Sequence, residues 1–414
     1  MTLRPDYLNF DPASRRVSID PHSPGFFQDP YPAYAFLHAN CPVFYWEEFG
    51  KWCFAGFEDV NRLLRDRAFG RENPDGPPTP QSSGPRSHLA DFDAVEAYSL
   101  LEREPPVHTR LRTLINRAFV SRQVERLRPR IETLSHQLID GFEGKRQIDL
   151  LPAFATPIPL MIIADMLGID HAMGVQLVCW SHDMVAMYMH GRTREDELQA
   201  AKSAHEFAGF IRAESRARVG TDKDDLLTLL AKAGADGETL TEDELVSTAI
   251  LLLNAGHEAT VHQSGNAVNA LLQSGQDLQT LFADDVASAA TVEECLRFDA
   301  PLHMFTRYTC RETEIADGVI LQPGEQIALL LGAANRDPAA FNRPELFSPQ
   351  RNDQKNVSFG AGIHFCIGAP LARLEMQVSL KVLFGRLPGM RLLTSPRYRD
   401  SYHFHGLEQL LVEW

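Results

Sequence analysis

The surroundings of Cys366 suggest chemistry more clearly than those of any other residue in this chain. The cysteine lies among three glycines and two phenylalanines, and apolar residues recur at helical spacing directly after this stretch. We therefore expect Cys366 just ahead of a helix N-terminus, with Pro370 in the first turn. Backbone N–H groups and the helix dipole would there lower the pKa of the thiol. The stretch reads Ser358-Phe359-Gly360-Ala361-Gly362-Ile363-His364-Phe365-Cys366-Ile367-Gly368-Ala369-Pro370.

The glycines of this stretch limit what could bind at the cysteine. Gly360, Gly362 and Gly368 permit positive φ angles and leave room for a flat molecule against the backbone. A thiolate on such a shelf is the arrangement that an axial ligand to haem iron needs. The alternative interpretation is a buried free cysteine in a turn, because cysteine is among the most buried residue types.

Two pairs of residues at helical spacing are further candidates. Glu294 and Arg297 stand three residues apart, so they share a helix face and can form an ion pair. His108 and Arg112 stand four residues apart, and two donors on one face suit a carboxylate or a phosphate. Taken alone, each pair is also compatible with an ordinary solvated helix surface.

A fourth candidate is the pair His257-Glu258, which begins a pattern similar to the zinc-protease motif His-Glu-x-x-His. Position 261 is Val261, however, and the next histidine is His262. Five residues along a helix turn through about 500°, which leaves the two imidazoles about 140° apart. We therefore do not expect these two histidines to share a metal ion.

Together these patterns resemble one known family. The cysteine stretch matches Phe-x-x-Gly-x-x-x-Cys-x-Gly and resembles the haem-binding segment of the cytochrome P450 family; the matching residues are Phe359, Gly362, Cys366 and Gly368. Glu294 and Arg297 resemble the Glu-x-x-Arg motif of that family. The resemblance implies that this pair is buried and is joined by an arginine shortly before the cysteine loop, a place that Arg351 holds.

The resemblance also implies the cofactor and its binding residues. The cofactor is haem b (iron protoporphyrin IX), and Cys366 is its metal ligand. The implied cofactor-binding residues are His108, Arg112, Ala255, Gly256, Arg307, Phe359, Gly360, His364, Cys366 and Gly368. The donors to the haem propionates among them are His108, Arg112, Arg307 and His364.

The distal side departs from the family pattern. In the family, an acid and a hydroxyl on a long helix relay protons to the oxygen side of the haem. Glu258 is the matching acid, but Ala259 stands where the family usually has threonine, and Thr260 follows. These three residues are the catalytic candidates. Thr260 could substitute through a helix distortion, or the substrate could supply the missing group; read alone, Thr260 bonds to the carbonyl four residues earlier.

The elements that must position these residues are mostly helical. A capping signal at residues 241–244 opens a long apolar helix, and helical patterns dominate residues 109–281. Hairpin or strand patterns occur at residues 43–55, 314–320 and 326–331. We predict a mainly α fold with small β-sheets, similar to cytochrome P450. We expect one large helical domain over residues 1–414, in which residues 1–28 form an irregular N-terminal arm.

Composition limits the partners and the compartment. Lysine and arginine number 40 against 55 aspartates and glutamates, and the net charge of −15 argues against nucleic-acid or anionic membrane partners. No apolar run approaches ~18 residues, and six scattered cysteines form no Cys-x-x-Cys pair. We expect a cytoplasmic protein in a reducing compartment, acting as a monomer.

The resemblance implies a monooxygenase that inserts one oxygen atom into an organic substrate. Electrons would come from NAD(P)H through a separate ferredoxin-type donor and its reductase. The expected pocket lining favours a small, largely apolar substrate, with His303 and His403 as candidate polar anchors; the lining segments are 73–104, 184–189, 251–255, 302–305 and 402–404. Two alternatives remain: a peroxygenase or a coupling or rearrangement enzyme, because of Ala259, and a non-catalytic haem sensor or carrier.

Overall fold

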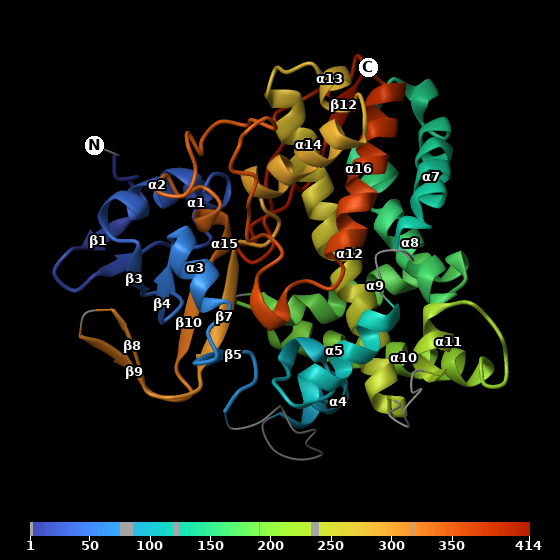
Figure 1. The fold of residues 1–414 in the computed structure, drawn as a ribbon, viewed down its shortest axis with the longest axis horizontal. Helices are drawn as coiled ribbons and strands as arrows, with labels where there is room; N and C mark the ends of the chain where they lie inside the picture. Colours follow the sequence, from blue (N-terminus) through green and yellow to red (C-terminus); the bar gives the residue numbers. More distant parts are fainter. Residues whose placement is uncertain (1–2, 75–85, 119–123, 190, 233–239, 317) are drawn as a thin grey trace.

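The structure, a computed structural model, describes residues 3–74, 86–118, 124–189, 191–232, 240–316 and 318–414. It is mainly helical with small sheets, as predicted. The helices form the larger part of the molecule, and the largest sheet and the β8–β9 hairpin lie on one side together with the N-terminal segment (Figure 1). Residues 75–85 of the predicted pocket segment 73–104 lie outside the described residues.

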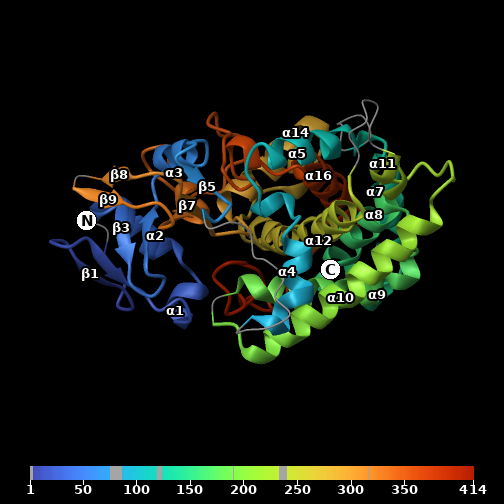
Figure 2. The same ribbon diagram turned by 90° about the horizontal axis from the view of Figure 1, so that it is seen from below.

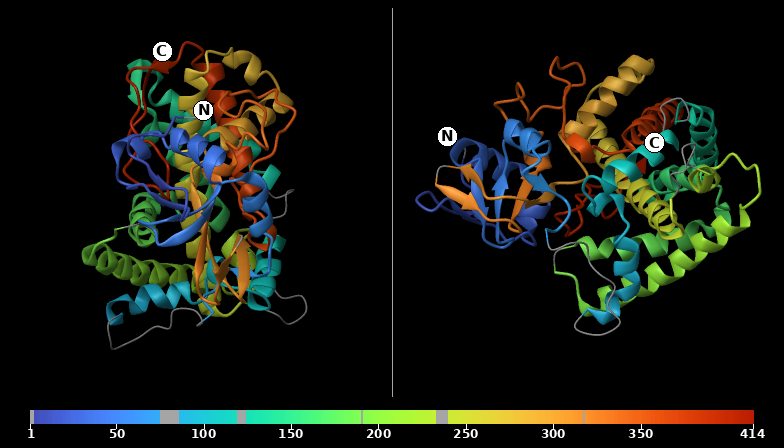
Figure 3. Two further views of the ribbon diagram at one scale, coloured as in Figure 1. Left: turned by 90° about the vertical axis from the view of Figure 1, so that its left-hand side faces the viewer. Right: turned by 60° about the horizontal axis from the view of Figure 1, so that its bottom comes forward.

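The largest sheet has seven strands in the order β1-β2-β3-β4-β10-β7-β5. β10 pairs in parallel with β4 and antiparallel with β7, so strands from opposite ends of the chain lie side by side (Figure 3). The predicted hairpin at residues 43–55 is confirmed as β3 and β4. The strands are β1 (Asn9–Asp11), β2 (Arg16–Ser18), β3 (Val43–Trp46), β4 (Lys51–Phe54), β5 (Phe69–Gly70), β7 (Met304–Thr309) and β10 (Gln326–Leu330).

The N-terminal arm differs from the prediction. The sequence predicts an irregular arm over residues 1–28, but β1 and β2 form an antiparallel hairpin, and β2 pairs in parallel with β3. The short helix α1 (Pro24–Phe27) follows. Val17 and Phe26 are fully buried, so the arm belongs to the core beneath the sheet. Strands of three residues carry too little periodicity to be recognised without their pairing partners.

Two smaller sheets complete the β-structure. β8 (Thr313–Ala316) and β9 (Val319–Leu321) form the second predicted hairpin. β12 (Leu411–Glu413) lies between β11 (Arg391–Leu392) and β6 (Gln147–Asp149), which joins the C-terminal end to the helical region.

The long helix α12 (Glu242–Gln273) crosses the middle of the helical region (Figure 1, Figure 2). The predicted capping box is confirmed: the Thr241 side chain accepts from the Glu244 backbone N–H, and the Glu244 carboxylate accepts from the Thr241 N–H. α10 packs against α12 and α9, and α16 packs against α7 and α14. The other long helices are α5 (Val107–Ala118), α7 (Arg128–Asp140), α8 (Pro157–Leu167), α9 (Gly174–Val185), α10 (Arg194–Ala217), α14 (Asp285–Phe298) and α16 (Ala369–Arg386).

Short helices connect these elements. They are α2 (Tyr31–Asn40), α3 (Phe57–Leu63), α4 (Ala90–Glu96), α11 (Leu226–Lys232), α13 (Leu278–Leu281) and α15 (Leu331–Ala334). Among the described residues, no helix combines the length and apolarity that a membrane crossing requires.

Candidate active site

Cys366 lies in a tightly turned loop that ends at the start of α16. Its backbone N–H donates to the Phe359 carbonyl at 3.0 Å, and the Gly360 N–H donates to the Val357 carbonyl at 2.8 Å. Gly362 has a φ of +72°, and a Cβ there would lie 2.5 Å from the Leu64 carbonyl oxygen. Only glycine therefore fits, because both the backbone angle and the close approach exclude a side chain.

The thiol itself departs from the prediction. Burial raises the pKa of Cys366, and the backbone N–H groups of Gly368 and Ala369, together with Arg112, lower it by less than burial raises it. The helix start is therefore in place, but alone it does not favour the thiolate. A metal cation bound by Cys366 would supply the missing positive charge, because a coordinating thiol is deprotonated. A Cβ on Gly368 would lie 3.8 Å from the sulfur, so glycine keeps that side bare.

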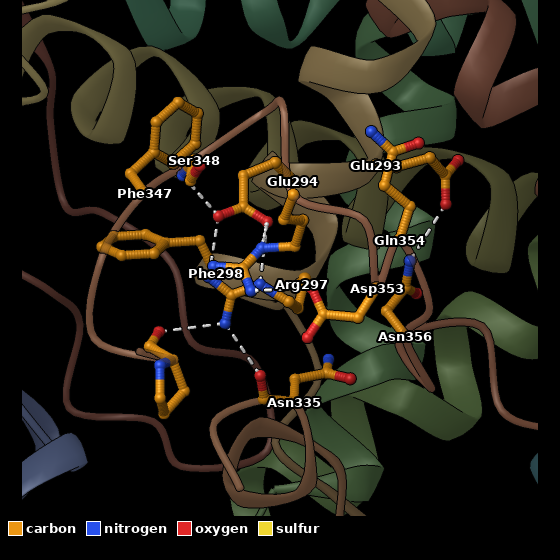
Figure 4. Close-up of polar contacts among 12 residues, drawn as sticks. Glu293, Glu294, Arg297, Phe298, Asn335, Phe347, Ser348, Asp353, Gln354 and Asn356 are labelled. Atoms are coloured by element: carbon orange, nitrogen blue, oxygen red, sulfur yellow. Dashed lines mark hydrogen bonds and ion pairs between the residues drawn. The ribbon is translucent and has the colours of Figure 1, made fainter. Parts of the chain in front are cut away.

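The predicted ion-pair network is confirmed. Arg297 contacts Glu294 through two hydrogen bonds of 2.8 Å, and Arg351 Nε donates to Glu294 Oε2 at 2.8 Å. The side chains of Glu294, Arg297 and Arg351 are 0%, 1% and 5% exposed. Figure 4 shows Glu294 and Arg297 turned toward each other, with Ser348 on the other side of the carboxylate. The three charges are therefore paired inside the protein.

Asn335 connects this network to the cysteine loop. Its carbonyl accepts from Arg297 Nη1 at 2.9 Å (Figure 4). Its side chain donates to Ser358 Oγ at 2.8 Å and accepts from the Val357 N–H at 2.9 Å. Ser358 and Val357 directly precede Phe359, to which Cys366 is hydrogen-bonded, so the buried ion pair fixes the start of the loop.

The four predicted propionate donors lie together beside the loop. The imidazole rings of His108 and His364 have centroids 4.4 Å apart. Arg112 Nη2 donates to the Phe365 carbonyl at 2.7 Å. Arg307 is buried and donates to the neighbouring Thr306 carbonyl at 2.8 Å.

Two neighbours of these donors, Glu104 and Arg71, could not be assigned to them from the sequence pattern. Glu104 Oε1 lies 2.9 Å from His364 Nε2 and accepts from the Arg71 backbone N–H at 2.8 Å. Burial, with Arg71 nearby, lowers the pKa of Arg307 to about 9. Arg71 directly follows the two-residue strand β5 and belongs to no motif, so only the folded chain brings it here.

These residues fit a haem with two propionates. His108 Nε2 is buried without a hydrogen-bond partner among the described residues. Arg307 bonds through its guanidinium only to its own strand's backbone there. An unpaired buried donor and an under-paired buried cation are both costly, and carboxylates satisfy both.

The 255–260 segment of α12 is a regular helix. Ala255 is exposed and Ala259 is half-buried, and the four-residue spacing places both on one face. Gly256 faces elsewhere, since a Cβ there would lie 3.7 Å from Ile163 of α8. Thr260 Oγ1 donates to the Gly256 carbonyl at 3.1 Å. The helix distortion that would turn the Thr260 hydroxyl elsewhere is therefore absent from this described helix.

Glu258 is surrounded by histidines. Its carboxylate lies 3.2 Å from His262 Nε2 and 3.1 Å from His182 Nε2, which comes from α9. Burial alone would raise the pKa of Glu258, but the hydrogen bonds from His182 and His262 lower it well below its ordinary value. In turn, the hydrogen bond to Glu258 raises the pKa of His182. His182 belongs to no motif, so sequence reasoning missed it.

A cavity of about 430 Å³ opens beside Glu258. It includes parts of the predicted lining, namely Tyr188, Met189, Met304 and residues 402–404, but no residue of 251–255 and none of the described residues of 73–104. His403 lines the cavity as expected. His303 does not: it is fully buried, and its Nδ1 lies 2.7 Å from the Tyr34 hydroxyl. His303 directly precedes β7, and its side chain packs against Tyr34 of α2, a contact between distant residues that the sequence pattern could not reveal.

Comparison with known proteins agrees with this geometry. The family model "Cytochrome P450" matches residues 288–387. Cytochrome P450 107B1 of Saccharopolyspora erythraea is 37% identical over 375 residues, which cover 87% of this chain and 88% of that protein. The biotin biosynthesis cytochrome P450 of Bacillus subtilis is 34% identical, with 94% of this chain and 96% of that protein covered. The 6-deoxyerythronolide B hydroxylase of Saccharopolyspora erythraea is 34% identical, with coverages of 95% and 98%.

Solved structures lead to the same conclusion. P450BioI, in complex with an acyl carrier protein ligated to hexadec-9Z-enoic acid, has a TM-score of 0.87 at 34% identity and covers 95% of this chain and all (100%) of its own. The polyketide synthase cytochrome P450 PksS of Bacillus subtilis has a TM-score of 0.85 at 30% identity, with coverages of 95% and 99%. With such identity over nearly the whole of both chains, this chain belongs to the cytochrome P450 family of monooxygenases, oxidoreductases that bind haem b through a cysteine thiolate.

Proposed function

We propose that this enzyme inserts one oxygen atom of O₂ into a small, largely apolar organic substrate, with Cys366 as the iron ligand. The observation that carries the proposal is the Cys366 loop, held by a buried ion-pair network and flanked by four donors suited to two propionates. Haem b, when bound, supplies the oxygen-activating redox chemistry. The protein residues position that group and control water and protons around it.

We assign these tasks to particular residues. Phe359, Gly360 and Gly368 form the bare surface beside the Cys366 sulfur. His108, Arg112, Arg307 and His364 bind the propionates. On α12, Ala255 and Ala259 share one face, and their small side chains leave room for the haem against that face. Glu258 holds a proton-transfer position at the cavity, where its carboxylate is kept ionised by His182 and His262.

The proton route past Ala259 needs a group that α12 does not provide. Thr260 points its hydroxyl at its own helix backbone, so it donates nothing to the cavity. We therefore propose that a substrate hydroxyl or an ordered water completes the route from Glu258. A second candidate function follows from the same observation: without a hydroxyl at position 259, the enzyme uses peroxide, or couples or rearranges its substrate.

The electron source and the substrate class are also proposals. We propose that electrons come from NAD(P)H through a separate ferredoxin-type protein and its reductase, as the family resemblance implies. The names of the relatives refer to biotin biosynthesis, to polyketide biosynthesis and to an acyl-chain carrier complex. Together with the apolar and aromatic part of the cavity lining, they support an apolar or partly oxygenated substrate.

The test of the iron ligand is spectroscopic. Reduced protein with carbon monoxide should give the strongly red-shifted Soret band of thiolate-ligated haem, and Cys366→Ser should abolish it. Cys179→Ser removes an exposed cysteine elsewhere and should leave the band unchanged. A spectrum of histidine-ligated haem in fresh wild-type protein would refute the proposal.

The oxygen source needs a separate experiment. Product formed with ferredoxin, reductase, NAD(P)H and O₂ should exceed product formed with hydrogen peroxide alone. The reverse order would favour the peroxide-driven alternative. A reduced protein that binds oxygen but converts no ligand that shifts its spin state would favour a sensor or carrier.

A further inference from the structure

Among the charged residues that line the cavity, the acids have hydrogen-bonding partners, whereas the arginines do not have partners of the same quality. Both kinds of charge and three imidazoles line it; the ionisable residues are His22, Arg192, Glu258, His262, Arg399, Asp400 and His403. Glu258 and His262 are buried at one end, whereas Arg192, Arg399 and Asp400 are exposed. The cavity therefore has an inner end at α12 and an outer end open to solvent.

The two acids at the cavity already have partners. Asp400 Oδ1 lies 2.8 Å from His22 Nδ1 at the outer end. Glu258 is bonded by His182 and His262 at the inner end. Within the described part of the chain, neither carboxylate forms an ion pair with Arg192 or Arg399.

The two arginines, Arg192 and Arg399, have no partners as close as those of the two acids. Within the described part of the chain, the Arg399 guanidinium forms no hydrogen bond or ion pair. Arg192 Nε lies 3.6 Å from Glu197, but that carboxylate also serves His88 at 2.8 Å and Arg194 at 3.4 Å. Of the charged residues that line the outer end, two are arginines and one, Asp400, is a carboxylate, so positive charge is in excess there on a chain whose net charge is −15. Such a local field concentrates anions at an opening.

Apart from the charged residues, the lining is mostly apolar or aromatic, with Ser401 and His403 as polar members; the larger apolar and aromatic residues are Phe49, Tyr188, Met189, Met304, Tyr402 and Phe404. A ligand that is complementary to both the apolar lining and the arginines has an apolar chain and one anionic end. Guanidinium binds a carboxylate through two parallel N–H···O bonds, which gives both affinity and orientation.

We propose that Arg399, assisted by Arg192, binds the carboxylate of an acyl-chain substrate at the outer end of the cavity. This specifies the substrate class of the proposed monooxygenase and rests on that function. With its carboxylate held there, the chain extends toward α12. Carbons remote from the carboxylate, rather than those next to it, are then presented for oxidation.

The experiment is a ligand titration of the haem-loaded enzyme, read by the Soret spin-state shift and, in parallel, by calorimetry. Dodecanoate should bind at least tenfold more tightly than methyl dodecanoate. Arg399→Gln should weaken dodecanoate binding about 10- to 100-fold, the range for hydrogen bonds to a charged group, and change ester binding less than twofold. Arg192→Gln should have a smaller effect in the same direction. Arg397→Gln removes an equal charge from an exposed residue outside the cavity and should change neither.

Several outcomes would overturn the proposal. These are equal affinity for acid and ester, equal loss in Arg399→Gln and Arg397→Gln, or tight binding of dodecyl phosphate with none of dodecanoate, which would assign the arginines to a phosphate. Failure of the underlying function is recognised separately. The carbon monoxide spectrum would then lack the thiolate band, while calorimetry would still measure carboxylate binding.

Discussion

The buried network at Glu294 permits a quantitative prediction. Glu294 accepts two hydrogen bonds from Arg297, one from Arg351 and one from the Ser348 backbone N–H, at 2.7 to 2.8 Å. Glu294→Gln keeps the shape of the side chain but removes the charge. Both arginine side chains are at most 5% exposed. Arg297 would keep a buried charge with no carboxylate, and Arg351 would retain only Asp353 at 3.2 Å. Breaking a buried pair in this way costs about 3–5 kcal/mol.

This cost is large against the whole stability of a domain, which is about 5–15 kcal/mol. The Asn335 link predicts a second effect: the cysteine loop should loosen as well, so the variant should retain less haem. The assay is urea unfolding of the haem-loaded protein followed by circular dichroism, with linear extrapolation to water. The haem-to-protein ratio is measured on the same samples.

A matched control is available on the surface. Glu345 lies 3.9 Å from Arg343, and both side chains are more than 60% exposed (64% and 69%). Glu345→Gln should therefore change the free energy of unfolding by about 0–1 kcal/mol. If Glu294→Gln costs no more than this control and retains its haem, the assignment of Glu294 as the brace of the loop is wrong.

Three further predictions concern the loop and α12. Gly362→Ala places a methyl group 2.5 Å from the Leu64 carbonyl at positive φ, so the purified variant should contain less haem by pyridine haemochromogen assay. His182 has a pKa raised by Glu258, so its contribution to stability is complete below pH ~6.5 and is lost as the pH rises through the raised pKa. In the wild-type protein, the urea concentration at the unfolding midpoint should therefore decrease as the pH rises above that value. In His182→Gln this decrease should be smaller. Thr260→Val should leave the product formed per NAD(P)H unchanged within about twofold, because the hydroxyl bonds within the helix.

Each of these predictions has a control or a contradicting result. Gly389→Ala adds a methyl group with no atom within 4 Å and should bind haem normally. His205→Gln removes an exposed histidine beside Asp91 and should not alter the pH profile. If the urea midpoint of His182→Gln still decreased as steeply with pH as that of the wild type, His182 would not be the group responsible for the decrease. A strong loss of coupling in Thr260→Val would show that its hydroxyl leaves the helix during turnover.

Some features of this protein follow from residues close together in the sequence. The Cys366 stretch, the capping box of α12 and the ion pair of Glu294 with Arg297 each depend on spacings of a few residues, so local geometry was enough to predict them. The hairpins at 43–55 and 314–320 were predictable for the same reason. The mainly helical fold followed from the length of the periodic segments.

Other features were decided only by contacts between distant parts of the chain. His182 meets Glu258 because α9 crosses α12, and Arg71 meets Glu104 because β5 brings it there. The raised pKa of the Cys366 thiol depends on desolvation by all the elements packed around it, which one helix start could not reveal. The sequence by itself determined which groups can carry out the chemistry. The tertiary structure decided their charge, their partners and the direction each side chain faces, because burial and electrostatics depend on every element packed around them.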